Sequence, residues 1–412
     1  MKILVVCQYY EPEPFRITDI CRDMVRRGHD ITVLCGIPNY PAGRFYPGYS
    51  LFHRRKEIVD GIRIIRSFVI PRGKGGKIGL SLNYLSFLAS AWVRHFRLAR
   101  QNFDAVFCFA LSPMTMALPA VAVARRARIP FTLYVADLWP ENVEAVNGIH
   151  NRRILNALGR MTGYIYRHCD RIMVSSRRFS ERMMKWGADP DRMVYWPQYA
   201  EDFYTPAQNP VETPSPYLAE FPVVFTGNIG VAQGLDVLIE AARRLSDLPA
   251  AVFYLVGDGR ARVSLETRVR EAGLQEKIVF CGRVPGELVP SYLARAGAAL
   301  LTMAPDPVFS LYLPLKLQTY LACGVPILCA ADGAAADVVN QAGAGLTARS
   351  GDAAGLADAV RRFSAMPLEE RTQMGHNARA CYDREYTKVR LMDELEDWLL
   401  HPRSAGRGGN VG

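Results

Sequence analysis

A short stretch at 314–326, PLKLQTYLACGVP, places a lysine at the start of an apolar run with helical spacing. The run ends at Gly324, a residue type that often ends helices in the left-handed conformation. Backbone N–H groups at a helix N-terminus favour an anion, and an ammonium beside them adds to the effect. The alternative is that Lys316 is only a solvated cap residue. The contacts predicted around a nucleotide diphosphate are Leu315, Lys316, Leu317 and Thr319.

Three further loops carry groups that suit the same anion: TGNIGVAQG at 226–234, VGDGR at 256–260 and CGRVPGE at 281–287. Glycines let backbone N–H groups approach a phosphate closely, and arginine supplies a cation. One Gly-rich turn is a weak signal because many strand–helix turns contain glycine. Together the loops predict a diphosphate site, with donor contacts from Gly227, Asn228, Gly230, Gln233, Gly234, Gly257, Asp258 and Arg283.

Two stretches in the first half, YYEPEPFRITD at 9–19 and ADLWPEN at 136–142, each follow an apolar run typical of a buried strand. Asp137 and Glu141 could orient a sugar hydroxyl or act as a base, so we predict them as catalytic together with Lys316. The alternative is that Asp137 caps a helix and that Trp139 packs. The residues predicted to contact the acceptor are Glu13, Phe15, Arg16 and Trp139.

Other catalytic motifs are missing from the sequence. None of the seven histidines pairs at i, i+4, and there is no GxSxG, Walker A or kinase motif. We therefore expect no metal and no cofactor. Hydrolysis, phosphoryl transfer and hydride transfer receive little support.

Strand-like and helix-like segments alternate along both halves, which predicts parallel sheets with right-handed crossovers. The fold class is α/β, with two Rossmann-like doubly wound domains that face a central cleft, where such sheets bind ligands. The predicted parts are an acceptor domain over 1–200, a nucleotide-sugar domain over 201–385, a helix over 386–401 that could cross between domains, and a disordered tail over 402–412. A Pro-rich polar stretch near 197–220 is the expected linker.

Residues 1–100 hold 17 Lys and Arg against 7 Asp and Glu, which equals the net charge of +10 of the whole 412-residue chain. Such a basic region favours an anionic partner, although it could serve solubility alone. Nucleic acid is not expected, because no nucleic-acid-binding motif occurs. The uncharged stretch 78–93 is too short to span a bilayer, and it could lie in a membrane interface or in a core. The nine cysteines are odd in number and form no Cys-x-x-Cys pair, and with the lack of a signal peptide they favour reduced thiols and a cytoplasmic protein.

Six stretches of the chain resemble the GT-B glycosyltransferases of family 4. They are YYEPEPFRITD, RRGHDITVLCGIPNYPAGRFYPGY, DLWPEN, TGNIGVAQGLD, LVGDG and PLKLQTYLACGVP. The resemblance covers essentially the whole fold and is nearest to the colanic acid and O-antigen (L-fucosamine-transferase-like) branch. It implies metal-independent, retaining transfer from a nucleotide sugar, UDP-linked rather than GDP-linked, to a polyprenyl-diphosphate-linked saccharide. It also implies a peripheral location at the inner membrane surface.

The chain departs from the family pattern at several positions. Where many members have a Glu, seven residues and a second Glu, this chain has Leu311 and Thr319. Asn228 and Gln233 replace the usual Arg and Lys of the Gly-rich loop, and Ala136 replaces a His. Two alternatives therefore stay open: a sugar-nucleotide epimerase of the same fold, and a noncatalytic GT-B assembly protein.

Overall fold

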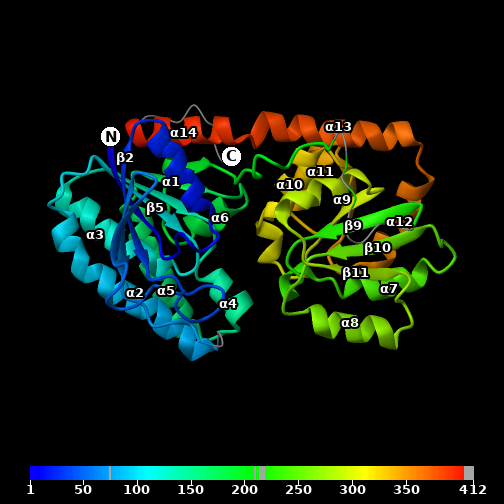
Figure 1. Ribbon diagram of the computed structural model, residues 1–412, viewed down its shortest axis with the longest axis horizontal. Coiled ribbons are helices and arrows are strands. Elements are labelled where there is room, and N and C mark those ends of the chain that lie inside the picture. The colour runs from blue at the N-terminus through cyan, green and yellow to red at the C-terminus, as the bar shows by residue number, and fades with distance from the viewer. Residues whose placement is uncertain (74–75, 208–209, 211, 213–218, 403–412) are drawn as a thin grey trace. The chain divides into compact units, whose positions relative to one another are not determined.

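The computed structural model describes residues 1–73, 76–207, 210, 212 and 219–402. The chain forms two compact units, one made of Met1–Trp196 with the residues from Met392 onward, and one of Pro197–Leu391 (Figure 1). The predicted tail lies outside the described residues, apart from Pro402. The predicted cleft between the two domains stays a prediction.

The first unit contains an eight-stranded sheet with the order β3-β4-β2-β1-β5-β6-β7-β8. All neighbouring strands are parallel except β3 and β4, an antiparallel edge that the sequence pattern did not predict. The central strands are buried on both faces, as their continuous apolar runs predict. The strands are β1 Lys2–Val6, β2 Asp30–Gly36, β3 Lys56–Val59, β4 Ile62–Ser67, β5 Ala105–Ala110, β6 Phe131–Val135, β7 Arg171–Val174 and β8 Met193–Tyr195.

Helix α2, Lys77–Leu98, is longer than the predicted apolar segment 78–93 and packs beside α3 (Figure 1). It buries Asn83, Phe87, Ala91, His95 and Leu98 at helical spacing. The other helices of this unit are α1 Arg16–Arg26, α3 Ala117–Ala127, α4 Glu141–Asn147, α5 Arg152–Arg167, α6 Phe179–Met184, and the 3-10 turns η1 Met114–Met116 and η2 Pro190–Arg192.

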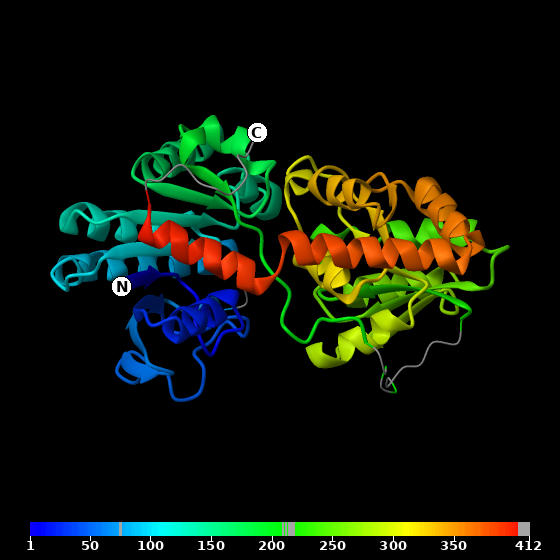
Figure 2. The same ribbon diagram turned by 90° about the horizontal axis from the view of Figure 1, so that it is seen from above.

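The last helix is α14 Lys388–Leu400, and its part from Met392 onward belongs to the first unit, where it forms ion pairs and apolar packing. Glu396 lies 2.8 Å from both Arg27 Nη1 and His29 Nε2, close to the end of α1. Trp398 is 2% exposed. Figure 2 shows α14, in red, beside the blue N-terminal segments.

The second unit contains a six-stranded parallel sheet with the order β11-β10-β9-β12-β13-β14. One hydrophobic core lies between one face and α9, α10, α11 and α13, and a second core lies between the other face and α7, α8 and α12. The strands are β9 Phe221–Thr226, β10 Ala251–Val256, β11 Ile278–Gly282, β12 Ala298–Thr302, β13 Ile327–Ala330 and β14 Gly345–Ala348. The helices are α7 Val237–Arg244, α8 Arg262–Glu271, α9 Val289–Ala294, α10 Leu315–Cys323, α11 Ala334–Ala342, α12 Ala353–Ala365 and α13 Leu368–Glu385, with 3-10 turns η3 Val231–Gln233, η4 Gly286–Leu288 and η5 Phe309–Leu311.

The predicted α/β class with two doubly wound parallel sheets is confirmed. All nine cysteines are free thiols, and all but Cys281 are buried. They contribute small apolar side chains to the cores rather than cross-links.

Candidate functional site

The loops that follow the strands of the second sheet are tied together at its carboxyl edge. Gly257, after β10, donates its N–H to Gly282 O at 2.8 Å, and Ile229, after β9, donates to Asp258 O at 2.8 Å. Ala304, after β12, donates to Ala232 O at 2.9 Å. The loops predicted from the sequence as one anion site therefore lie together in this unit.

Two glycines of these loops have no room for a side chain. Gly257 has φ +153°, and a Cβ on it would lie 1.8 Å from the carbonyl oxygen of Gly227. Gly234 has φ +61°, and its Cβ would lie 2.8 Å from the backbone of Ala304. Close backbone approach and a positive φ together explain why these positions are glycine.

We expect Gly257→Ala to separate the loops after β9 and β10 and to lower the free energy of unfolding by about 1–3 kcal/mol, as overpacking does. Nucleotide binding should weaken at least about 10-fold because the N–H groups of the two loops shift. Gly273→Ala is a matched control in the same unit: its φ is +68°, but a Cβ there meets nothing within 4 Å. Thermal unfolding and UDP titration would check both variants, and equal behaviour would contradict the prediction.

Lys316 is the second residue of α10, as the sequence pattern predicted. Its Nζ is buried 3.6 Å from the centroid of the Phe225 ring and has no hydrogen-bond partner among the described residues. Helix α10 packs on the face of the sheet that holds Val224, whereas the Phe225 side chain faces the opposite core. Phe225 is the next-to-last residue of β9, so a Lys316 side chain that contacts its ring lies near the carboxyl end of β9, where the Gly-rich loop begins.

Burial lowers the pKa of the Lys316 ammonium well below its usual value. A buried cation without a carboxylate or carbonyl partner is unfavourable, and the Phe225 ring compensates only part of the cost. A phosphate placed beside Nζ would supply the missing negative charge and hydrogen-bond acceptors. The site can therefore hold an anion, and this electrostatic feature could not be seen in the sequence.

The other predicted donor residues differ in accessibility. Leu315 is 49% exposed, and the Thr319 hydroxyl donates to its carbonyl oxygen at 3.4 Å. Leu317 is fully buried in the core and its N–H donates to Pro314 O at 2.9 Å, so the structure gives it no free group for a ligand. Arg283 is exposed beyond the end of β11, and Gln233 Oε1 is buried without a partner among the described residues.

The remaining predicted donor residues belong to the loops after β9 and β10. Asn228 is exposed, with Oδ1 2.6 Å from where a Cβ of Gly259 would lie. Asp258 accepts the Gly259 N–H at 2.8 Å and lies 3.9 Å from Arg262, so its carboxylate organises its own turn. Gly227 and Gly230 belong to the same loop after β9.

In the first unit, Asp137 follows β6 and Ser112 follows the neighbouring strand β5. The Ser112 hydroxyl donates to Asp137 Oδ2 at 2.8 Å and accepts the Trp139 indole N–H at 3.1 Å. Burial raises the pKa of the Asp137 carboxyl, and the hydrogen bond from Ser112 opposes that rise. This carboxylate is therefore positioned and desolvated, as a group that orients a hydroxyl would be. Trp139 is 6% exposed and mostly packs.

The other carboxylates predicted in this half have structural partners. Glu141 begins α4 and accepts the Trp186 indole N–H at 3.3 Å, while its Oε2 is buried without a partner among the described residues. Glu13 is 2% exposed and accepts backbone N–H groups from Tyr10, Asn39 and Tyr40 at 3.2, 2.8 and 2.7 Å. Burial raises the pKa of Glu13 to about 7, against these hydrogen bonds. Glu13 therefore joins the loops after β1 and β2.

Phe15 and Arg16 lie at the start of α1. The Phe15 ring stacks on Tyr9 with centroids 5.0 Å apart and meets Tyr40 at 5.2 Å. These aromatic rings follow β1 and β2 at the carboxyl edge of the sheet, the edge where such folds bind ligands.

The sequence reasoning missed several groups at this edge. Ser112 is the partner of Asp137, and Arg72 follows β4 among three tyrosine rings. A serine before Pro113, directly after a predicted strand, was a signal for the first. No signal existed for the second, because β4 itself was not predicted.

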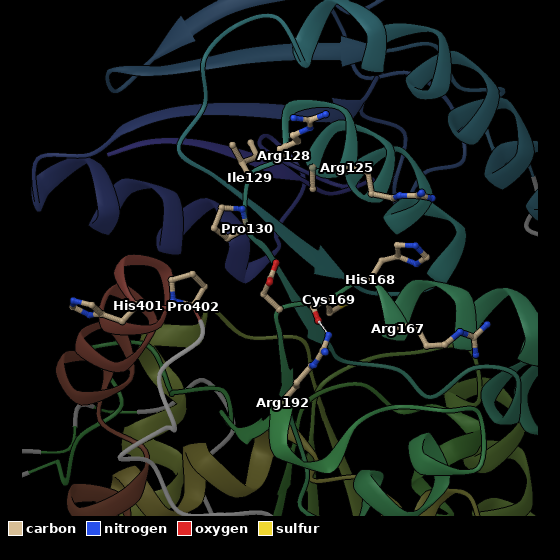
Figure 3. Close-up of a pocket in the computed structure, with 12 residues that line it drawn as sticks. Arg125, Arg128, Ile129, Pro130, Arg167, His168, Cys169, Arg192, His401 and Pro402 are labelled. Atoms are coloured by element: carbon tan, nitrogen blue, oxygen red, sulfur yellow. Dashed lines mark hydrogen bonds between the residues drawn. The ribbon is translucent and has the colours of Figure 1, made fainter.

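A separate pocket of about 840 Å³ lies at the opposite, amino edge of the first sheet, before β6, β7 and β8 (Figure 3). Its arginines are largely engaged: Arg125 donates to the Tyr164 hydroxyl at 3.0 Å, and Arg192 pairs with Asp189 at 3.1 Å. Arg128 and His168 are the C-cap residues of α3 and α5, and His168 Nδ1 lies 2.7 Å from Tyr164 O. The basic lining is therefore explained without a ligand.

Comparison with known proteins assigns both units. A family model described as "Glycosyl transferase 4-like domain" matches residues 15–198, and one described as "Glycosyl transferases group 1" matches residues 216–380. "Probable glycosyltransferase WbjE" of Pseudomonas aeruginosa is 25% identical over 64% of this chain and 66% of the relative. "Putative colanic acid biosynthesis glycosyl transferase WcaI" of Escherichia coli K12 is 24% identical over 79% of this chain and 82% of the relative.

Among solved structures, Anabaena Alr3699/HepE in complex with UDP-glucose aligns over 97% of this chain and 100% of that chain, with a TM-score of 0.67 and 15% identity. That identity supports the fold alone. Both of these relatives are named glycosyltransferases. The two matched domains, the two doubly wound sheets and these relatives agree: the chain belongs to the GT-B glycosyltransferases of family 4.

Proposed function

We propose that this glycosyltransferase moves a sugar, with retention of configuration and without a metal, from a nucleotide sugar to a polyprenyl-diphosphate-linked saccharide. The nucleotide is UDP rather than GDP, and the product belongs to exopolysaccharide, colanic acid or O-antigen synthesis. The relatives named for colanic acid biosynthesis support this polymer class. The solved structures that hold UDP or UDP-glucose support the donor class.

The observation that carries the proposal is the buried Nζ of Lys316, which lies 3.6 Å from the Phe225 ring near the end of β9 and has no hydrogen-bond partner among the described residues. When the glycosyl bond breaks, negative charge develops on the leaving diphosphate. A preorganised ammonium and loop N–H groups stabilise that charge in a desolvated site. One diphosphate oxygen then accepts the proton of the acceptor hydroxyl, so no covalent enzyme intermediate is needed.

We assign Asp137 to the acceptor sugar. Its carboxylate is fixed by Ser112 and partly desolvated, so it can accept a hydrogen bond from a sugar hydroxyl with little reorganisation. Glu141, at the start of the next helix, accepts the Trp186 indole N–H and is the second carboxylate that we propose on this side. Phe15 and Arg16 offer an aromatic surface and a cation beside the same edge.

A thermal-shift screen tests the donor class directly, because a ligand that binds only the folded state raises the unfolding temperature. UDP and UDP-sugars should raise the unfolding temperature, and GDP should raise it less. Incubation with UDP-N-acetylhexosamines and no acceptor separates transfer from epimerisation. An isomerised sugar would replace the proposal with the epimerase, and a chain that binds no nucleotide would replace it with the assembly protein.

A membrane location is supported by the outward face of α2. Ile78, Leu85 and Val93 are 79%, 58% and 70% exposed, and Leu82, Trp92 and Phe96 are 45%, 44% and 49% exposed on the same helix. Lys77 and Arg97 lie at its two ends, and Arg126 stacks on Phe96 with 5.1 Å between Cζ and the ring centroid. An apolar stripe with flanking cations suits the interface of an anionic bilayer. Within the described ranges, no helix has the length and apolar character to cross a bilayer.

Val93→Glu should reduce binding to vesicles that contain phosphatidylglycerol at least about 10-fold, because a carboxylate at the stripe is repelled and costly to desolvate. Val263→Glu on α8 is the matched control, since Val263 is 74% exposed and lies in the other unit. Vesicle flotation at low and high salt is the measurement. Equal flotation of the two variants would remove the membrane role of α2.

A further inference from the structure

A single arginine of the first unit lies among three tyrosine rings at the carboxyl edge of the sheet. The Cζ atom of Arg72 is 4.9 Å from the ring centroid of Tyr9, 5.1 Å from that of Tyr40 and 5.8 Å from that of Tyr84. Its Nη2 donates to the Tyr9 hydroxyl. Its Nε is buried and has no partner among the residues that the structure describes.

The backbone around Arg72 is fixed by the neighbouring loops. The Arg72 N–H donates to Asn39 Oδ1 at 3.4 Å, and the Gly73 N–H donates to Gly43 O at 2.9 Å. Asn83 Nδ2 donates to the same Asn39 oxygen at 3.2 Å from α2. The guanidinium is therefore held by the loops after β2 and β4 and by α2, rather than by a flexible surface segment.

Arg66, only six residues earlier, shows what a structural arginine looks like in this unit. It is 1% exposed and its Nε and Nη2 both donate to Glu57, while Nη2 also donates to Glu11 O at 2.8 Å. Arg72 has no carboxylate partner in the described part of the chain. Glu13 influences it electrostatically, but the Glu13 oxygens are already occupied by three backbone N–H groups. A half-buried guanidinium with a buried Nε and no anion beside it in the described residues can still bind one.

The chemistry that fits is a phosphate group. A guanidinium offers a planar fork of donors to phosphate oxygens, and tyrosine rings around it provide hydroxyl donors and an apolar wall. Burial raises the pKa of Tyr84 and the charge of Asp137 adds to that rise, so the cluster lies within electrostatic reach of the catalytic carboxylate predicted in this unit. We infer that Arg72, with Tyr9, Tyr40 and Tyr84, is a phosphate-binding site that receives the phosphate of the acceptor. This inference rests on the proposed function for the identity of that phosphate as the acceptor's.

The test is calorimetric titration with inorganic pyrophosphate, done both without UDP and with saturating UDP. UDP occupies the diphosphate site of the second unit, so pyrophosphate that still binds reports the Arg72 site. Arg72→Gln should weaken this binding about 10- to 100-fold, as expected for loss of a charged hydrogen bond. The pyrophosphate affinity of Arg72→Lys should lie between those of the wild type and Arg72→Gln, because lysine keeps the positive charge but lacks the planar pair of guanidinium donors. Arg63→Gln, an exposed arginine on β4, is the control and should bind like the wild type.

Two further ligands separate the sources of the phosphate. A lipid diphosphate is supported if the wild type binds geranyl diphosphate more tightly than pyrophosphate and if Arg72→Gln loses that extra affinity. Glucose 1-phosphate showing the same Arg72 dependence instead supports a soluble sugar phosphate. Circular dichroism checks that each variant is folded.

Two results would overturn the inference: no pyrophosphate binding by the wild type in the millimolar range, or equal binding by the wild type and Arg72→Gln when both are folded. A chain that fails to bind UDP but still binds pyrophosphate through Arg72 would overturn the proposed donor and leave the phosphate site standing.

Discussion

Lys316→Met should lower kcat/KM for glycosyl transfer about 10²- to 10³-fold or more, the effect of removing one preorganised group that stabilises developing negative charge. The same variant should be as stable as the wild type or more stable, because methionine fills the position beside Phe225 with an apolar side chain, whereas the buried Lys316 Nζ has no partner among the described residues. Activity and stability would therefore change in opposite directions. Initial rates and thermal unfolding measure the two effects.

The stability difference should depend on pH. The folded-state pKa of Lys316 is lowered, so the unfolded chain binds the proton more tightly than the folded chain does. The wild type therefore loses stability as pH falls below the usual lysine value, until the lowered pKa is reached. The advantage of Lys316→Met should be large at neutral pH and should shrink as pH rises toward about 10.

Lys277→Met is the matched control for this prediction. Lys277 lies in the same unit, and its ammonium donates to Leu248 O at 2.6 Å and to Ala251 O at 3.2 Å. Removing it should destabilise the protein by about 1–2 kcal/mol and leave transfer intact, because two carbonyl groups lose their donor. If both lysine variants lost stability and kept activity, the phosphate role of Lys316 would be wrong.

Asp137→Asn should lower kcat about 10²- to 10³-fold, within the range for positioned acid–base groups. The amide keeps an oxygen that can accept the Ser112 hydroxyl, so the loop after β6 should stay in place. What is lost is the negative charge that attracts a sugar hydroxyl. UDP affinity should not change, because the nucleotide is held by the second unit in this proposal.

Asp170→Asn controls for a general loss of structure in the same unit. Its Oδ2 accepts the Phe131 N–H at 3.0 Å at the start of β6, the opposite end of the strand that Asp137 follows. This variant should affect the unfolding temperature more than the rate. A normal rate in Asp137→Asn would assign Asp137 a purely structural role.

In the second unit, helix α10 and the position of Lys316 on it could be predicted from the sequence, because the residues that mark them are close together in the chain. Lys316, the apolar run after it and Gly324 lie within a few residues, and helix spacing alone places the lysine at the N-terminus of α10. The direction of each side chain was less predictable. Leu317 was expected at the donor but points into the core, because neighbouring residues of a helix face directions about 100° apart.

The first unit was predicted less completely because its site is assembled from distant segments. Asp137 could be placed at the end of a strand, but its partner Ser112 comes from a separate strand. Arg72 meets Tyr9, Tyr40 and Tyr84, which lie in three other segments of the chain. The short strands β3 and β4 were not recognised, so nothing in the sequence marked Arg72 as a residue at the carboxyl edge.

The most direct test of the account is a calorimetric titration of UDP into the wild type and Lys316→Met, each in two buffers with different ionisation enthalpies. Burial lowers the pKa of the Lys316 amine in the free protein, and a diphosphate beside it raises that pKa again, so the wild type should take up protons as UDP binds. Lys316→Met should bind UDP at least about 10-fold more weakly and without that proton uptake. Equal affinity and equal proton uptake in both proteins would contradict the assignment of Lys316 to the leaving diphosphate.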